Sequence, residues 1–65
     1  MESDIIKVYR FDGSELVVNA DLIETVEATP DTVITLTTGK KIVVTDSVEV
    51  IIKRVVDYKQ AIFRR

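Results

Sequence analysis

Short apolar stretches separated by turn residues fill the first two thirds of the chain, and a helical pattern follows them. The stretches are rich in valine, isoleucine and threonine, whose branched side chains suit the pleated surface of a sheet. Turn signals stand between them at Asp12-Gly13, Pro30-Asp31 and Gly39. The pattern therefore predicts five strands, at residues 5–11, 15–19, 22–28, 32–37 and 41–44.

The first two predicted strands are separated by Asp12-Gly13, a strong signal for a two-residue hairpin turn, because a type I′ turn has positive φ at both central residues. Such a turn would place Arg10 opposite Glu15. Both faces of this hairpin would then carry apolar side chains. Two covered faces require either a strongly curled sheet or a second subunit.

The second hairpin is expected to turn through a three-residue loop, Thr38 to Lys40. This loop opposes Ile34 to Val44 and keeps the apolar residues of both strands on one face. Gly39 would supply the left-handed residue of the loop. Between the hairpins, residues 19–21 predict a bend, since asparagine and aspartate side chains bond to their own backbone.

A helix is predicted over residues 47–63, where apolar residues recur at helical spacing. Asp46 would be its N-cap, with Glu49 completing a capping box. The apolar arc spans roughly 160° at about 100° per residue, which is wide enough to cover a sheet and leave an edge for another chain. At that edge lie Val56 and Phe63, the predicted contacts between subunits.

These elements predict an α+β fold: a small antiparallel sheet of five short strands, made of two hairpins and a linking strand, followed by one C-terminal amphipathic helix. Lys59 falls inside the apolar arc of this helix. Its ammonium group is expected either to reach the dipole at the helix C-terminus or to lie at an interface.

The 65 residues are expected to form a single domain, 1–65. A chain of this size buries only roughly 60% of its unfolded surface, so it needs further stabilisation. Cysteine and histidine are both absent, which excludes disulfides and the usual zinc sites. Self-association into a homo-oligomer is one remaining source of stability, and an unusually tight monomer core is the other.

Charge is unevenly distributed along the chain. Residues 1–39 hold eight acidic and two basic residues, a net charge of −6, whereas residues 40–65 hold three acidic and seven basic residues, a net charge of +4. Such a dipolar protein can associate head to tail or bind a charged partner.

The N-terminus is acidic and no apolar stretch is long enough to span a bilayer, so the cytoplasm is the expected location.

Catalytic and cofactor-binding patterns are not found in the sequence. Without histidine or cysteine there is no imidazole base and no thiolate nucleophile. Asp21, Glu24, Glu27 and Asp31 lack the regular ligand spacing of a calcium loop, so we interpret them as solvated charges. We expect no enzyme activity, no metal and no cofactor. The basic residues of the predicted helix point in scattered directions, which argues against a nucleic-acid stripe.

Four sequence segments occur here in an order that resembles a known family: Ile6 to Gly13, Asn19 to Glu24, Thr29 to Leu36, and Gly39 to Lys41. So arranged, they are similar to the small FlbD-type flagellar proteins, also called the SwrD swarming-motility family. The Thr-Pro-Asp-Thr-Val-Ile-Thr-Leu run is the most specific part. Asp12 and Thr38, where asparagine is common in the family, are minor departures.

The resemblance implies a bacterial cytoplasmic protein at the inner face of the membrane, which helps the stator units of the flagellar motor deliver power. It implies neither an enzymatic activity nor a cofactor. We therefore expect a non-enzymatic module that binds stator or motor proteins; the alternative is a small RNA- or DNA-binding regulator of flagellar genes. Exposed turns on a rigid sheet are common recognition sites, so the candidate contacts are Thr29, Pro30, Asp31, Gly39 and Lys40.

Overall fold

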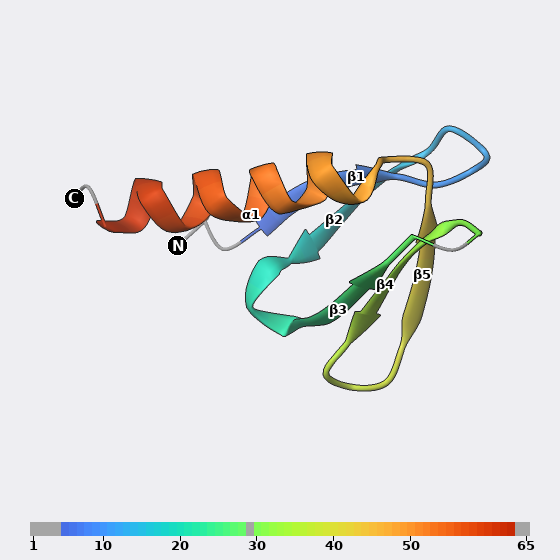
Figure 1. The fold of residues 1–65 in the computed structure, drawn as a ribbon, viewed down its shortest axis with the longest axis horizontal. Coiled ribbons are helices and arrows are strands. Elements are labelled where there is room, and N and C mark those ends of the chain that lie inside the picture. Colours follow the sequence, from blue (N-terminus) through green and yellow to red (C-terminus); the bar gives the residue numbers. More distant parts are fainter. Residues whose placement is uncertain (1–4, 29, 64–65) are drawn as a thin grey trace.

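The computed structural model describes residues 5–28 and 30–63, with side chains up to Gln60. Its elements are β1 (Ile5–Tyr9), β2 (Glu15–Asn19), the 3₁₀ helix η2 (Ala20–Leu22), β3 (Ile23–Glu27), β4 (Thr32–Leu36), β5 (Lys41–Val44) and α1 (Val48–Phe63). The α+β fold class is confirmed. The strands form two antiparallel sheets and not one: β1-β2, and β3-β4-β5 (Figure 1).

The ends of several elements differ from the prediction. β2 and β5 have the predicted bounds, whereas β1, β3, β4 and α1 are shorter by one or two residues. β1 ends at Tyr9 because Arg10 belongs to the turn, where its carbonyl accepts a hydrogen bond from the Gly13 N–H at 3.0 Å. β3 begins only after Leu22, the last residue of η2.

The β1–β2 hairpin turns through Phe11 to Gly13, so the predicted two-residue turn is wrong. Arg10 N–H donates to the Ser14 carbonyl at 2.9 Å, and Gly13 is the loop residue with positive φ, at 89°. Type I′ geometry would also need positive φ at Asp12, and no described residue other than glycine has it. The Asp12 carboxylate instead accepts the Ser14 N–H and the Ser14 hydroxyl, at 2.9 and 2.7 Å. These two hydrogen bonds lower the pKa of Asp12.

Because the turn is one residue longer than predicted, the hairpin register differs from the predicted register by one residue. Tyr9 lies opposite Glu15, so the predicted pairing of Arg10 with Glu15 is wrong. A one-residue shift turns every β2 side chain to the other face. The predicted distribution of apolar residues between the two faces is therefore wrong, although both faces do carry apolar side chains. The buried residues of the hairpin share one face, and the other face exposes Ile5 and Val17 beside a Lys7–Glu15 ion pair at 3.5 Å.

The β4–β5 hairpin uses the same kind of turn. Leu36 N–H donates to the Lys40 carbonyl and Gly39 N–H donates to the Leu36 carbonyl, both at 2.8 Å. The three-residue loop and the positive φ of Gly39, 93°, are confirmed. The loop begins at Thr37, one residue earlier than predicted, because the glycine must be its third residue. Ile34 consequently pairs with Ile42 and not with Val44, a two-residue shift that keeps the same face inward.

Replacing Gly39 with valine is expected to destabilise the protein by about 1–2 kcal/mol or more, because left-handed backbone is unfavourable for residues with a Cβ atom. A Cβ at this position would meet no atom within 4 Å, so the effect is one of backbone conformation and not of collision. Gly39→Asn is the control, since asparagine tolerates this conformation better. Denaturant midpoints measure both variants, and equal losses would contradict the assignment.

The core lies between the two sheets, with α1 along the β1–β2 hairpin (Figure 1). Every element except β3 contributes a buried side chain. In the part of α1 whose side chains are described, Ile51 and Tyr58 are buried, and they lie two turns apart on one face. Among the residues whose side chains are described, the buried core residues are Ile6, Val8, Val18, Ala20, Ile34, Ile42, Val44, Ile51 and Tyr58.

The N-cap of α1 is Ser47, so the predicted cap at Asp46 is wrong. The Ser47 hydroxyl accepts the Val50 N–H at 3.2 Å, and the Ser47 carbonyl accepts the Ile51 N–H at 3.1 Å. Glu49 then stands one position too early for a capping box.

The predicted bend before β3 is confirmed in η2, where the Asn19 side chain accepts the Asp21 N–H at 2.9 Å.

Ser47→Ala is expected to destabilise the protein by about 1 kcal/mol, because the Val50 N–H loses its acceptor at the helix start. Ser47→Asn should retain most of the stability, since asparagine is also a good N-cap. Thermal or denaturant unfolding monitored by helical circular dichroism measures the difference. If the alanine and asparagine variants are equally stable, Ser47 is not the cap.

Candidate interaction surfaces

Asp46 joins three segments that lie far apart in the sequence. Its Oδ2 accepts the Tyr9 N–H of β1 at 2.8 Å, and its Oδ1 accepts a hydrogen bond from Arg54 Nη1 of α1 at 3.1 Å. Beside it, Thr45 N–H donates to the Tyr9 carbonyl at 2.8 Å. The Asp46 side chain is only 9% exposed. The carboxylate thus fixes the start of α1 against the end of β1.

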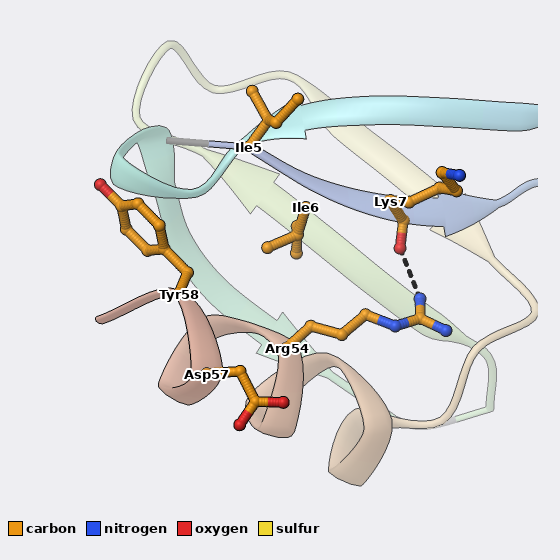
Figure 2. Close-up of a pocket in the computed structure, with 6 residues that line it drawn as sticks. All are labelled: Ile5, Ile6, Lys7, Arg54, Asp57 and Tyr58. Atoms are coloured by element: carbon orange, nitrogen blue, oxygen red, sulfur yellow. Dashed lines mark hydrogen bonds between the residues drawn. The ribbon is translucent and has the colours of Figure 1, made fainter. Parts of the chain in front are cut away.

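A shallow, open hollow of about 370 Å³ lies between β1 and α1, next to this junction. Figure 2 shows the Arg54 side chain reaching from α1 to the Lys7 carbonyl, to which it donates a hydrogen bond, with Ile6 between strand and helix. The floor is apolar and the rim carries charges of both signs. Such a mixed lining suits contacts with another polypeptide. The lining residues are Ile5, Ile6, Lys7, Arg54, Asp57 and Tyr58.

A second carboxylate holds the other half of α1. The Tyr58 hydroxyl donates to Asp21 Oδ2 at 3.2 Å, and Lys59 Nζ lies 3.6 Å from Asp21 Oδ1. Lys59 also stands 5.7 Å from the centre of the Tyr58 ring. The ion-pair partner of Lys59 is therefore Asp21, a residue of η2. Asp46 thus connects the first half of α1 to β1, and Asp21 connects the second half to η2.

The turn residues predicted as partner contacts do not form one surface. Pro30 and Asp31 are exposed in the β3–β4 turn, and Gly39 and Lys40 are exposed in the β4–β5 turn. The two turns lie at opposite ends of β4 (Figure 1), which is roughly 17 Å long at 3.3 Å per residue. Thr29 lies outside the described residues. These residues stay predicted contacts, and the structure divides them into two separate sites.

One side of α1 exposes apolar residues. Ile52 is 53% exposed, and Val56, one turn later, is 43% exposed. The side chain of Phe63 lies outside the described part of the structure. Val56 is thus accessible for the predicted subunit contact, which stays a prediction. Ile52, which the sequence analysis did not name, is four residues from Val56 and therefore lies on the same face.

Sequence reasoning also missed the junction at Asp46 and the hollow beside it. A signal for the junction exists in the sequence. Ser47 follows Asp46 directly and is itself a preferred N-cap residue, which leaves the aspartate available for another partner. No local pattern indicates that this partner is β1.

The basic side chains of α1 up to Gln60 are all ion-paired. Lys53 lies 3.1 Å from Asp57, Arg54 lies 3.1 Å from Asp46, and Lys59 lies 3.6 Å from Asp21. In the described part of the chain, no three acidic side chains come together as a metal site. None of the described helices is both long and apolar enough to cross a bilayer.

The fold is that of a small α+β domain in which Asp46 connects α1 to β1 and Asp21 connects α1 to η2. The family model of the FlbD flagellar and swarming motility proteins matches residues 5–63, which run from the start of β1 to the end of α1. The chain therefore belongs to this family, and the resemblance seen in its sequence is confirmed. Comparison with curated proteins and with solved structures gave no match.

Proposed function

We propose that the protein is a non-enzymatic interaction module that supports the power of the flagellar motor by binding a cytoplasmic part of the stator or motor. The observation that carries the proposal is membership of a flagellar and swarming motility family over residues 5–63. The sequence offers neither histidine nor cysteine for catalysis, which agrees with a binding role. The protein would work in the cytoplasm, at the inner face of the membrane beside the motor.

The two exposed turns of the β3-β4-β5 sheet are the proposed contacts with the motor. The β3–β4 turn presents the carboxylate of Asp31, and the β4–β5 turn presents the ammonium group of Lys40. Both turns belong to hairpins of one sheet, so their positions relative to each other are fixed by the pairing of β4. Opposite charges at the two ends of β4 would orient the module on a partner that carries the complementary charges.

A pull-down from motile cells with the tagged full-length chain tests the proposal. Stator or motor proteins are expected to come with the tagged chain. Asp31→Lys and Lys40→Glu should each reduce their recovery, because each variant reverses an exposed charge at a proposed contact. Glu49→Lys, a charge reversal on the exposed side of α1, is the matched control and should bind normally. If no motor component is recovered with the unmodified chain, the proposal fails.

The alternative function, regulation through RNA or DNA, has less support from the structure. Phosphate binding needs free positive charge on one face, whereas the described bases of α1 are ion-paired and residues 1–39 carry a net charge of −6. Titration with mixed RNA and duplex DNA at low salt separates the two functions. Tight binding that weakens steeply with added salt would favour the alternative.

A further inference from the structure

The outer edge of β2 is open to another strand. Among the described residues, β2 has one strand neighbour, β1. The N–H and carbonyl of Tyr9 bond to Asp46 and Thr45, away from β2, and Arg10 N–H donates to the Ser14 carbonyl, so Tyr9–Glu15 is not a hydrogen-bonded pair and the positions on either side of it are. Such pairs alternate in an antiparallel ladder, so Leu16 and Val18 also bond to β1. The residues whose peptide groups point away from β1 are Glu15, Val17 and Asn19.

The other strand edges are protected against pairing, and the edge of β2 is not. The outer edge of β1 is occupied by Thr45, Asp46 and Arg54. β3 has an irregular register and carries Glu24 and Glu27, whose charges would repel those of a second copy. β5 is only four residues long. β2 contains no proline, no basic residue and no irregularity, so it lacks the usual protections of an edge strand.

We propose that a second copy of this chain pairs with the outer edge of β2 in antiparallel orientation, about a two-fold axis at Val17. This pairing opposes Val17 to Val17 of the second copy and Glu15 to Asn19 of the second copy. The two-stranded β1-β2 sheet becomes half of a four-stranded sheet. A two-stranded hairpin is only marginally stable alone, and two further strands provide the missing pairing.

The side chains along this edge are complementary under the two-fold axis. Asn19 Oδ1 is already bonded to the Asp21 N–H at 2.9 Å, which leaves the Asn19 amide hydrogens to donate to the Glu15 carboxylate of the second copy. No like charges are opposed. Val17 is 51% exposed and Ile5, its diagonal neighbour on β1, is 48% exposed. Pairing would align these residues from both copies in one apolar strip across four strands.

Analytical ultracentrifugation over a range of concentrations tests the proposal. The unmodified chain is expected to reach twice its monomer mass of 7.3 kDa. Val17→Lys places two like charges opposite each other at the axis, so it should raise the dimer Kd by at least about tenfold. Val17→Glu should do the same. A mixture of the lysine and glutamate variants should form dimers again, because the opposed charges then attract.

Three controls make the result specific to β2. Val43→Lys changes another outward-facing valine, 41% exposed on β5, and should leave the dimer intact. Circular dichroism shows whether each variant is folded. Ile52→Lys and Val56→Lys probe the α1 contact predicted from the sequence. If the α1 variants dissociate the dimer while Val17→Lys does not, or if the unmodified chain stays monomeric at every concentration, the pairing through β2 is wrong.

Discussion

Replacing Ile51 with alanine is expected to destabilise the protein by about 2–5 kcal/mol, the usual range for truncating a fully buried isoleucine. Ile51 is 0% exposed and belongs, with Tyr58, to the buried core. A domain of this size rarely gains more than about 3–5 kcal/mol from its core. The variant should therefore be largely unfolded at room temperature, with a loss of both helical and strand circular dichroism.

The neighbouring isoleucine provides a matched control. Ile52 is 53% exposed, so the same change to alanine removes little buried surface and should cost less than about 1 kcal/mol. Denaturant titration of the two variants gives the comparison directly. Equal losses would mean that α1 presents a different face to the sheets, because consecutive residues are about 100° apart on a helix.

Asp46→Ala should have the second largest effect, about 2–4 kcal/mol, because it removes the acceptor of the Tyr9 N–H and the carboxylate partner of Arg54. The Tyr9 N–H loses the carboxylate that it bonds at 2.8 Å, and the Arg54 guanidinium loses its ion-pair partner. The arginine side chain is 33% exposed and can regain water, which limits the loss. Equilibrium unfolding in denaturant measures the change in free energy.

Two comparisons distinguish this junction from a helix cap or a surface charge. Asp46→Ser would preserve stability if residue 46 were the cap, whereas here serine is too short to bond both Tyr9 and Arg54. Asp57→Ala removes an exposed partner of Lys53 and should cost less than about 0.5 kcal/mol. In a double-mutant cycle, Asp46→Ala and Arg54→Ala should be non-additive. Additive losses would show that the two side chains act independently.

The number, type and order of the elements follow from local sequence. Branched residues in short stretches, glycine in the turns and apolar residues at helical spacing each act within a few positions. That is why the bend at Asn19, the positive φ of Gly39 and the helix to residue 63 are all predicted. Family membership is also readable from the sequence, because its motifs are continuous runs of residues.

The strand registers are only partly determined by local sequence. In both hairpins the glycine is the third residue of a three-residue loop, and this position sets which residues pair. The Asp12-Gly13 dipeptide fits a two-residue turn equally well by composition. The choice depends on which face of β2 can be buried against the rest of the protein, and this is a property of the packed core.

Only the tertiary structure decides the role of Asp46, the difference between Ile51 and Ile52, and the separation of the two turns predicted as contacts. Asp46 bonds Tyr9 across 37 positions of the chain, and Tyr58 bonds Asp21 across the same separation. The helical pattern places both Ile51 and Ile52 in the apolar arc. Which of the two is buried depends on the side of α1 that packs against the sheets. Contacts between residues so distant in sequence arise when the elements pack, so no short stretch of the chain contains them.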